Sequence, residues 1–389
     1  MLRAIDKWLP GYLKHLVRRP RGVQGPCDLM FCVADHYEPF VGRVAAPEAM
    51  DRVRRWASEY PRQVDGHRDA DGMSPRHTFF YPAEDYHAPC LDELVSLCRA
   101  GHGEVEVHLH HRNDTPDGLR EKLRKFREAL SSRHGCLGRD AAGNSRFAFI
   151  HGNWALCNSR PDGDWCGVNQ ELGILRDAGC FVDMTFPSAP SPTQTRHVNT
   201  IWRACDHKEH PRSFDRGVPV RAGSGCSPEH DRETLMLIGG PLALNWRRRK
   251  WGMLPRVETG DLTGANPPGR DRVDLWLAQH IHVPGRPEWV FIKVHTHGCD
   301  PRNIDALLGE AMQRMWQHLE HRCNDGHHWR LHYVSAREMF NIVRAAEDGR
   351  SGSPHQYRDY AILPPHARGR TYPSIESSEE YKIPRLRSG

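Results

Sequence analysis

The chain has 389 residues, of which 38% are hydrophobic and 26% are charged, and its formal net charge is +5. This balance is that of a globular protein with a sizeable core, and the scattered Lys and Arg form no basic stripe that would indicate a nucleic-acid partner. The 26 histidines are the unusual feature, because histidine is the commonest metal ligand and general acid or base.

The first predicted element is an amphipathic, basic segment within residues 1–26, which lies on both sides of Pro10. Residues 1–19 either dock on the protein's own domain, the interpretation we favour, or make a peripheral contact with an anionic membrane surface. No stretch reaches the ~18 uninterrupted apolar residues of a transmembrane span.

Apolar runs of strand length then recur along the chain. Helical patterns lie between most of them, such as 47–60, 91–101, 115–130, 169–179, 304–321 and 336–349. This alternation predicts a parallel α/β sheet, and with seven or eight strands we favour a barrel over an open sheet. The predicted strands are 28–35, 76–82, 104–110, 146–152, 180–186, 235–240, 289–295 and 329–334.

Two regions depart from this alternation. Residues 187–234 are rich in Pro, Ser, Thr, His and Arg and predict a long loop insertion with little regular structure. Residues 349–389 predict an extended C-terminal tail. The main domain is therefore expected to cover residues 27–348.

Titratable side chains follow the predicted strands at their carboxyl ends, which is where parallel α/β folds place their sites. Four or five strands contribute to this end, so we expect the side chains to converge. The candidates are Asp35, His36 and Glu38 after the first strand; His108, His110 and His111 after the third; His151, Asn153 and Trp154 after the fourth; Asp183 on the fifth; and His295 and His297 after the late strand.

The run EVEVHLHH, residues 104–111, is the most informative of these. A strand period of two places His108 and His110 on one face, where two imidazoles can reach one zinc ion at about 2.0–2.1 Å. Asp35 could supply a carboxylate, either as a ligand or as a base. His295 and His297 are candidates for a metal ligand, a general acid or a hydrogen-bonded buried pair. For His108, His110 and His111 we favour a metal site over one hydrogen-bonded core histidine with the others solvated, and for His295 and His297 we favour a catalytic or binding role.

The order of these segments resembles the polysaccharide deacetylase superfamily, the NodB-like carbohydrate esterases. VADHYEP stands where that family has an acidic pair, and HTFFYPAEDY, LDELVSLCRAGHG and EVEVHLHH resemble its Phe-Phe strand, helix and histidine strand. FAFIHGNWAL stands where the family has an arginine groove motif, and VFIKVHTHG resembles its closing strand. The resemblance covers about residues 28–186 and 286–300.

This resemblance implies an incomplete (β/α)7-type barrel of parallel strands with long loops, holding one divalent metal, Zn²⁺ or another ion such as Co²⁺. It implies Asp35 as base or ligand, with His36 as a ligand in the first case, and His108 as the first metal histidine. Arg112 occupies the family's second histidine position, so His110 or His111 takes that role. His295 or His297 becomes the catalytic acid. Glu38, His151, Asn153, Trp154 and Asp183 are the substrate-binding candidates.

We therefore predict a metal-dependent carbohydrate deacetylase, which removes N-acetyl groups from a sugar or polysaccharide precursor through a metal-activated water. One alternative is a glycoside hydrolase that uses two carboxylates from Asp35, Glu38 and Asp183. Another is an inactive glycan-binding or assembly protein. The twelve cysteines contain no CxxC pair, and we expect reduced thiols in a cytoplasmic protein.

Overall fold

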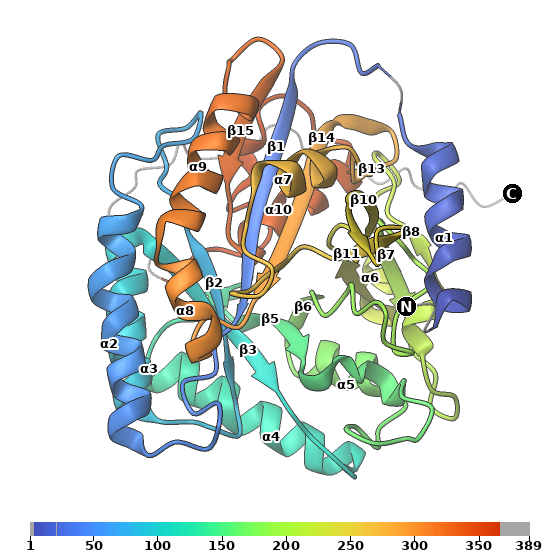
Figure 1. The fold of residues 1–389 in the computed structure, drawn as a ribbon. Coiled ribbons are helices and arrows are strands. Elements are labelled where there is room, and N and C mark those ends of the chain that lie inside the picture. Colours follow the sequence, from blue (N-terminus) through green and yellow to red (C-terminus); the bar gives the residue numbers. More distant parts are fainter. Residues whose placement is uncertain (1–3, 21, 366–389) are drawn as a thin grey trace, which may run out of the picture.

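The computed structural model describes residues 4–20 and 22–365, which form a mixed α/β fold around a large, mostly parallel sheet (Figure 1). The helices are α1 (Ile5–Arg18), α2 (Ala46–Gln63), α3 (Ala88–Leu97), α4 (Pro116–Glu128), α5 (Glu171–Asp177), α6 (Pro228–Glu233), α7 (Arg270–Leu277), α8 (Pro301–Leu307), α9 (Glu310–Cys323) and α10 (Ala336–Glu347). The strands are β1 (Cys27–His36), β2 (His77–Pro82), β3 (Gly103–Leu109), β4 (Gly138–Arg139), β5 (Ser145–His151), β6 (Cys180–Asp183), β7 (Ile201–Cys205), β8 (Gly217–Pro219), β9 (Thr234–Ile238), β10 (Ala243–Lys250), β11 (Leu254–Glu258), β12 (Asp261–Leu262), β13 (His282–Val283), β14 (Arg286–Thr296) and β15 (Trp329–Tyr333).

The main sheet has the strand order β12-β14-β1-β2-β3-β5-β6-β9-β7-β8, and its pairs from β12 to β9 are parallel. All eight predicted strand segments are strands of this sheet. β1 pairs with β14 along one edge, and its other edge is shared by β15 at the start and β2 at the end. The pairings found within the described residues do not join β12 to β8, so closure into a barrel stays a prediction.

Alternation along β1 divides the core into two layers. Leu29, Phe31 and Val33 pack with the helix layer that includes α2, α3 and α9, whereas Met30 and Ala34 pack with α10 on the opposite face. Strands with both faces buried are nearly continuous in apolar residues, and for this reason β1 could be predicted from the sequence. Figure 1 shows β1 and β14 side by side through the middle of the molecule.

Local signals set the helix ends. The Thr115 hydroxyl accepts the Gly118 N–H at the start of α4, and Ser335 and Glu338 form a capping box at α10. The pattern 304–321, predicted as one helix, is two helices in the structure. Gly309 has an extended backbone and separates α8 from α9.

The prediction of little regular structure in 187–234 is wrong. β7 and β8 lie there and extend the sheet through antiparallel pairing with β9, and α6 follows. The apolar alternation in β7 is only five residues long, and neighbouring Pro, Ser and His residues conceal it. In the predicted tail, Pro354–Tyr357 forms a short 3₁₀ turn and Leu363 bridges to Arg139, while residues 366–389 lie outside the described part.

The N-terminal helix α1 packs on its own domain. Trp8 and Tyr12 are buried in a cluster with Val198 and Leu242. Residues 1–3 of the segment with the predicted membrane contact are outside the described range. Across the residues that the structure describes, no helix is both long and apolar enough to cross a membrane.

Candidate functional site

Histidines from three strand ends gather on one face of the sheet. β1 ends at His36, His108 is the penultimate residue of β3, and His297 directly follows β14. The register Asp35↔Thr296 places the ends of β1 and β14 together, and Pro82↔His108 places β3 beside the end of β2. The predicted convergence of His36, His108 and His297 is therefore present in the fold.

The carboxylate at the centre of this group belongs to Glu38. Its Oε1 lies 3.1 Å from His108 Nε2 and 3.5 Å from His110 Nε2, and its Oε2 lies 3.6 Å from His297 Nδ1. The His36 ring centroid is 4.6 Å from that of His297 and 4.9 Å from that of His108. Four imidazoles thus surround one carboxylate.

Two of these histidines are oriented through their other ring nitrogen. His108 Nδ1 lies 2.9 Å from the Ile150 carbonyl oxygen, to which it donates, and His110 Nδ1 lies 2.5 Å from Glu84 Oε1. If these Nδ1 atoms carry the protons, both Nε2 atoms present lone pairs to Glu38 Oε1. Lone pairs facing a carboxylate require a proton or a cation between them, and such outer partners are typical of metal-ligating histidines.

The electrostatics of the group favour an ionised Glu38. Burial alone would raise the pKa of its carboxyl, but the adjacent His108 and His297 imidazoles hold that pKa well below its usual value. Burial and the neighbouring imidazoles lower the pKa of His36, so its ring is neutral at pH 7. Burial opposes protonation of His110 and His297 too, but Glu84 and Glu38 respectively outweigh it and raise the two pKa values.

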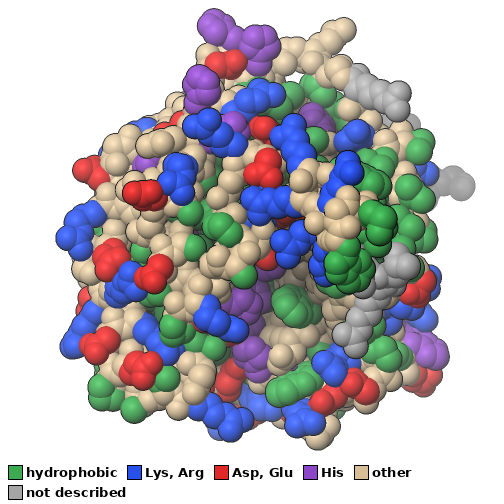
Figure 2. Space-filling view, viewed as in Figure 1, with side chains coloured by type: hydrophobic (Ala, Val, Ile, Leu, Met, Phe, Trp, Pro, Cys, Tyr) green, Lys and Arg blue, Asp and Glu red, His purple; other side chains and the backbone are tan. Residues whose placement is uncertain are grey.

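The group opens into a cleft of about 460 Å³. Figure 2 shows histidine side chains at the floor of a hollow near the centre of the visible face. The His110 and His297 side chains are 29% and 33% exposed, so a ligand can reach them, whereas His108 is fully buried beneath. The cleft lining is His36, Glu38, Val41, His110, Asn153, Trp154, Thr263, Ala265, His297, Asp300, Arg302 and Asn303.

Asp35 does not belong to the donor group around Glu38. Strand alternation turns its side chain to the helix side of the sheet, where it is fully buried. Its Oδ1 accepts the Gly298 N–H at 2.6 Å, and its Oδ2 lies 3.4 Å from His77 Nδ1. Asp35 therefore anchors the turn after β14. His36 and Glu38 continue the alternation on the opposite face, and this period of two is the sequence signal that identifies Glu38.

The other predicted residues occupy four different surroundings. Asn153 and Trp154 line the cleft. Asp183 is buried and accepts hydrogen bonds from the backbone N–H and hydroxyl of Thr185. His295 is buried with its ring centroid 6.3 Å from that of His36. His111 and His151 lie in a separate buried group with Cys166 and Glu171, two residues that sequence reasoning missed.

No protein-family model matches this chain, and a search of curated proteins finds no match to it.

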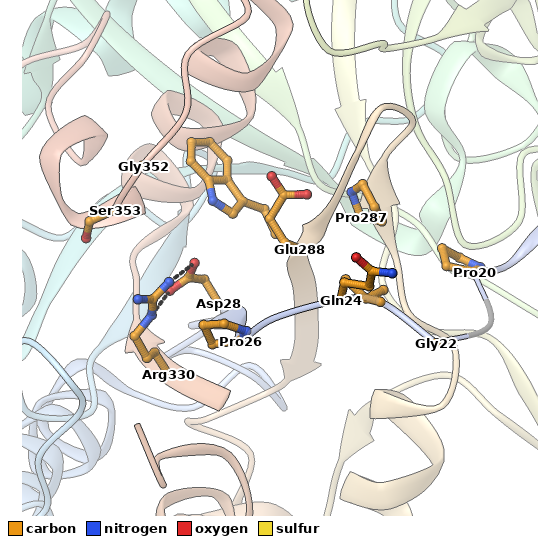
Figure 3. Close-up of a pocket in the computed structure, with 12 residues that line it drawn as sticks. Pro20, Gly22, Gln24, Pro26, Asp28, Pro287, Glu288, Arg330, Gly352 and Ser353 are labelled. Carbon is orange, nitrogen blue, oxygen red and sulfur yellow. Dashed lines mark hydrogen bonds and ion pairs between the residues drawn. The ribbon is translucent and has the colours of Figure 1, made fainter. Parts of the chain in front are cut away.

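A larger hollow, of about 700 Å³, lies at the opposite edge of the sheet, where β1 and β14 begin (Figure 3). Asp28 in its wall makes two hydrogen bonds with Arg330, at 2.7 and 2.8 Å, and a third with His332. Glu288 is paired with Arg286. The acids of this hollow are thus already paired, and the described residues lining it include neither histidine nor cysteine.

Proposed function

We propose that this chain is a metal-dependent hydrolase that removes N-acetyl groups from a sugar or polysaccharide precursor. The observation that supports it is the Glu38 carboxylate, encircled by imidazoles at the carboxyl ends of parallel strands and open to a cleft. The sugar amide as substrate and the incomplete barrel rest on the sequence resemblance, the cytoplasmic location rests on the cysteine pattern, and all three are part of this proposal.

The donor set fits one divalent cation. His108, His110 and Glu38 each offer a donor atom, and these atoms lie within 4.8 Å of one another, as do those of His36, Glu38 and His297. Imidazole and carboxylate donors suit Zn²⁺, with Co²⁺ as an alternative. We assign His108, His110 and Glu38 as the ligands, because both Nε2 atoms face Glu38 Oε1. A cation held there would polarise the acyl oxygen and lower the pKa of water.

The remaining side chains have distinct roles in the hydrolysis. Water adds to the acyl carbon, the C–N bond breaks, and the amine nitrogen gains a proton. The neutral ring of His36 accepts the proton that the water loses, and the partly exposed His297, whose pKa is raised beside Glu38, donates a proton to the leaving amine. This proposal moves the base from Asp35, which faces the helices, to the cleft.

Trp154 supports a sugar substrate. Its ring lines the cleft beside Asn153, and aromatic faces pack against the apolar faces of sugar rings. The glycoside hydrolase alternative has less support from the geometry, because only Glu38 of its three candidate carboxylates lines the cleft. The inactive-binder alternative differs from the proposal in needing no cation.

Acetate release from N-acetylated oligosaccharides, with zinc or cobalt restored after chelation, tests the proposal. We expect metal-dependent release that Glu38→Gln abolishes. The matched control Glu310→Gln, at an exposed side chain of α9, should leave the rate unchanged. Release of reducing ends without acetate would instead support the glycosidase, and a protein that binds no cation would support the inactive binder.

A further inference from the structure

A second group of metal-ligating side chains lies behind the cleft. His111 follows β3, His151 ends β5, Cys166 lies in the loop after β5, and Glu171 begins α5. The four donor atoms lie within 4.8 Å of one another, and all four residues are buried. They come from four positions in a 61-residue stretch, so their meeting is a product of the fold.

Both histidines direct Nε2 at the same carboxylate oxygen. His111 Nε2 lies 3.1 Å and His151 Nε2 lies 3.5 Å from Glu171 Oε1. On the far side of each ring, His111 Nδ1 lies 3.2 Å from Asp114 Oδ2, and His151 Nδ1 donates to the Gly152 carbonyl oxygen. A carboxylate or carbonyl behind each imidazole is the arrangement that fixes metal-ligating tautomers.

Two ring nitrogens of the group, His111 Nδ1 and His151 Nε2, have no hydrogen-bond partner among the described residues. The ion pairs with Asp114 and Glu171 can stabilise a protonated His111 without a metal, but they provide no hydrogen bond to His151 Nε2. With its proton on Nδ1, His151 presents a bare Nε2 lone pair toward Glu171, and that buried atom has no hydrogen-bond partner among the described residues. Such buried polar atoms are rare in native proteins and indicate a missing partner.

Cys166 supplies the fourth donor. Its Sγ lies 3.4 Å from Glu171 Oε2, and the backbone N–H groups of Asn158 and Val168 donate to it at 3.3 and 3.4 Å. Burial and Glu171 raise the pKa of the Cys166 thiol, which in the free site donates to Glu171 Oε2, whereas a bound cation would favour the thiolate, the form of cysteine that binds metal.

We propose that His111, His151, Cys166 and Glu171 form a structural zinc site, separate from the cleft. Four protein ligands, here two imidazole nitrogens, one sulfur and one carboxylate oxygen, make a closed zinc site, and burial leaves no open position for a substrate. The site is independent of the hydrolase proposal, since none of its ligands lines the cleft.

The site fastens the loop that forms one wall of the cleft. Between β5 and α5 the backbone makes only short 3₁₀ turns, and Asn153, Trp154 and Cys157 adopt left-handed conformations, which are costly for residues with a side chain. The ligands bracket this segment at His151 and Glu171. Zinc would therefore hold Asn153 and Trp154 in place at the cleft.

Cobalt substitution of the full-length protein tests the site, because a thiolate ligand adds a charge-transfer band in the near ultraviolet. The donor group around Glu38 contains no thiol, so the band reports on Cys166 alone. We expect the band in the wild type and its loss in Cys166→Ser, with one equivalent less zinc per chain. Chelation should also lower the melting temperature of the wild type.

The matched control is Cys157→Ser, which changes a buried thiol of the same loop outside the donor group. It should keep the band, as should Glu38→Gln, which removes only the cleft ligand. A band that survives Cys166→Ser would overturn the site. If that variant does not fold, the wild type decides: absence of any thiolate–cobalt band would refute the proposal even when the cleft binds cobalt.

Discussion

Gly152→Ala should displace His110 from the cleft without unfolding the protein. A Cβ at residue 152 would lie 2.5 Å from Cγ and 2.8 Å from Nε2 of the His110 ring. Ordinary carbon contacts are about 3.5–4.0 Å, so the ring or the backbone has to move by about 1 Å. The φ angle of Gly152 is not positive, so alanine adds no backbone strain of its own.

The expected magnitudes follow from this displacement. A misplacement of about 1 Å costs about 10²-fold in rate, and disturbing the support of a metal ligand weakens metal affinity by about 10- to 100-fold. Overpacking should lower the free energy of unfolding by about 1–3 kcal/mol. Zinc competition titration measures the affinity, acetate release measures kcat/KM, and urea denaturation measures the stability.

Gly269→Ala is the matched control, because a Cβ there meets only the side chains of Asp271, at 3.2 Å, and Arg248. That variant should keep wild-type zinc affinity and rate. If Gly152→Ala folds and also keeps both within twofold, His110 is not a ligand and the assignment of His108, His110 and Glu38 fails.

Three further substitutions test the site and the fold around it. His108→Ala should remove the cleft metal, as measured by metal analysis, and leave Ile150 O unpaired at a cost of about 1–3 kcal/mol, whereas the exposed His328→Ala should do neither; unchanged metal content would exclude His108. Burial raises the pKa of Asp183 to about 7 in the folded protein, so the native state binds more protons than the unfolded state from about pH 4 to 7, and wild-type stability should fall as pH rises through that window. Asp183→Asn should flatten this decline in pH-dependent urea denaturation, and an unchanged slope would contradict the buried assignment. Arg337→Met should destabilise the protein by about 3–5 kcal/mol, because it leaves Glu104 buried without its partner, and adding Glu104→Gln should recover much of the loss; equal stability of the single and double variants would refute that explanation.

The sheet was predictable from sequence where both faces of a strand are buried. Apolar runs mark β1 and β14 plainly, and the alternation at the end of β3 correctly places His108 and His110 on one face. β7 is short and lies among prolines and serines. α7 could not be predicted from the sequence because its buried face includes Arg272. An arginine normally indicates an exposed position, but Arg272 is buried and paired with Glu258. Local patterns do not reveal such distant pairings.

The site was predictable in its histidines and less so in its acids. A strand's carboxyl end identifies where side chains gather, but one residue of register decides which face they occupy. Asp35 lies within β1 and Glu38 follows it, yet strand alternation places Glu38 and not Asp35 on the face of the cleft. Cys166 and Glu171 lie in a loop and at a helix start without periodicity, so only the fold brings them to His111 and His151.

Anomalous diffraction at the zinc edge, from crystals of the zinc-loaded protein, tests the central claim most directly. The account predicts a peak about 2.0–2.2 Å from His108 Nε2, His110 Nε2 and a Glu38 oxygen, at the floor of the cleft. Zinc-loaded crystals without a peak among these three side chains would contradict it.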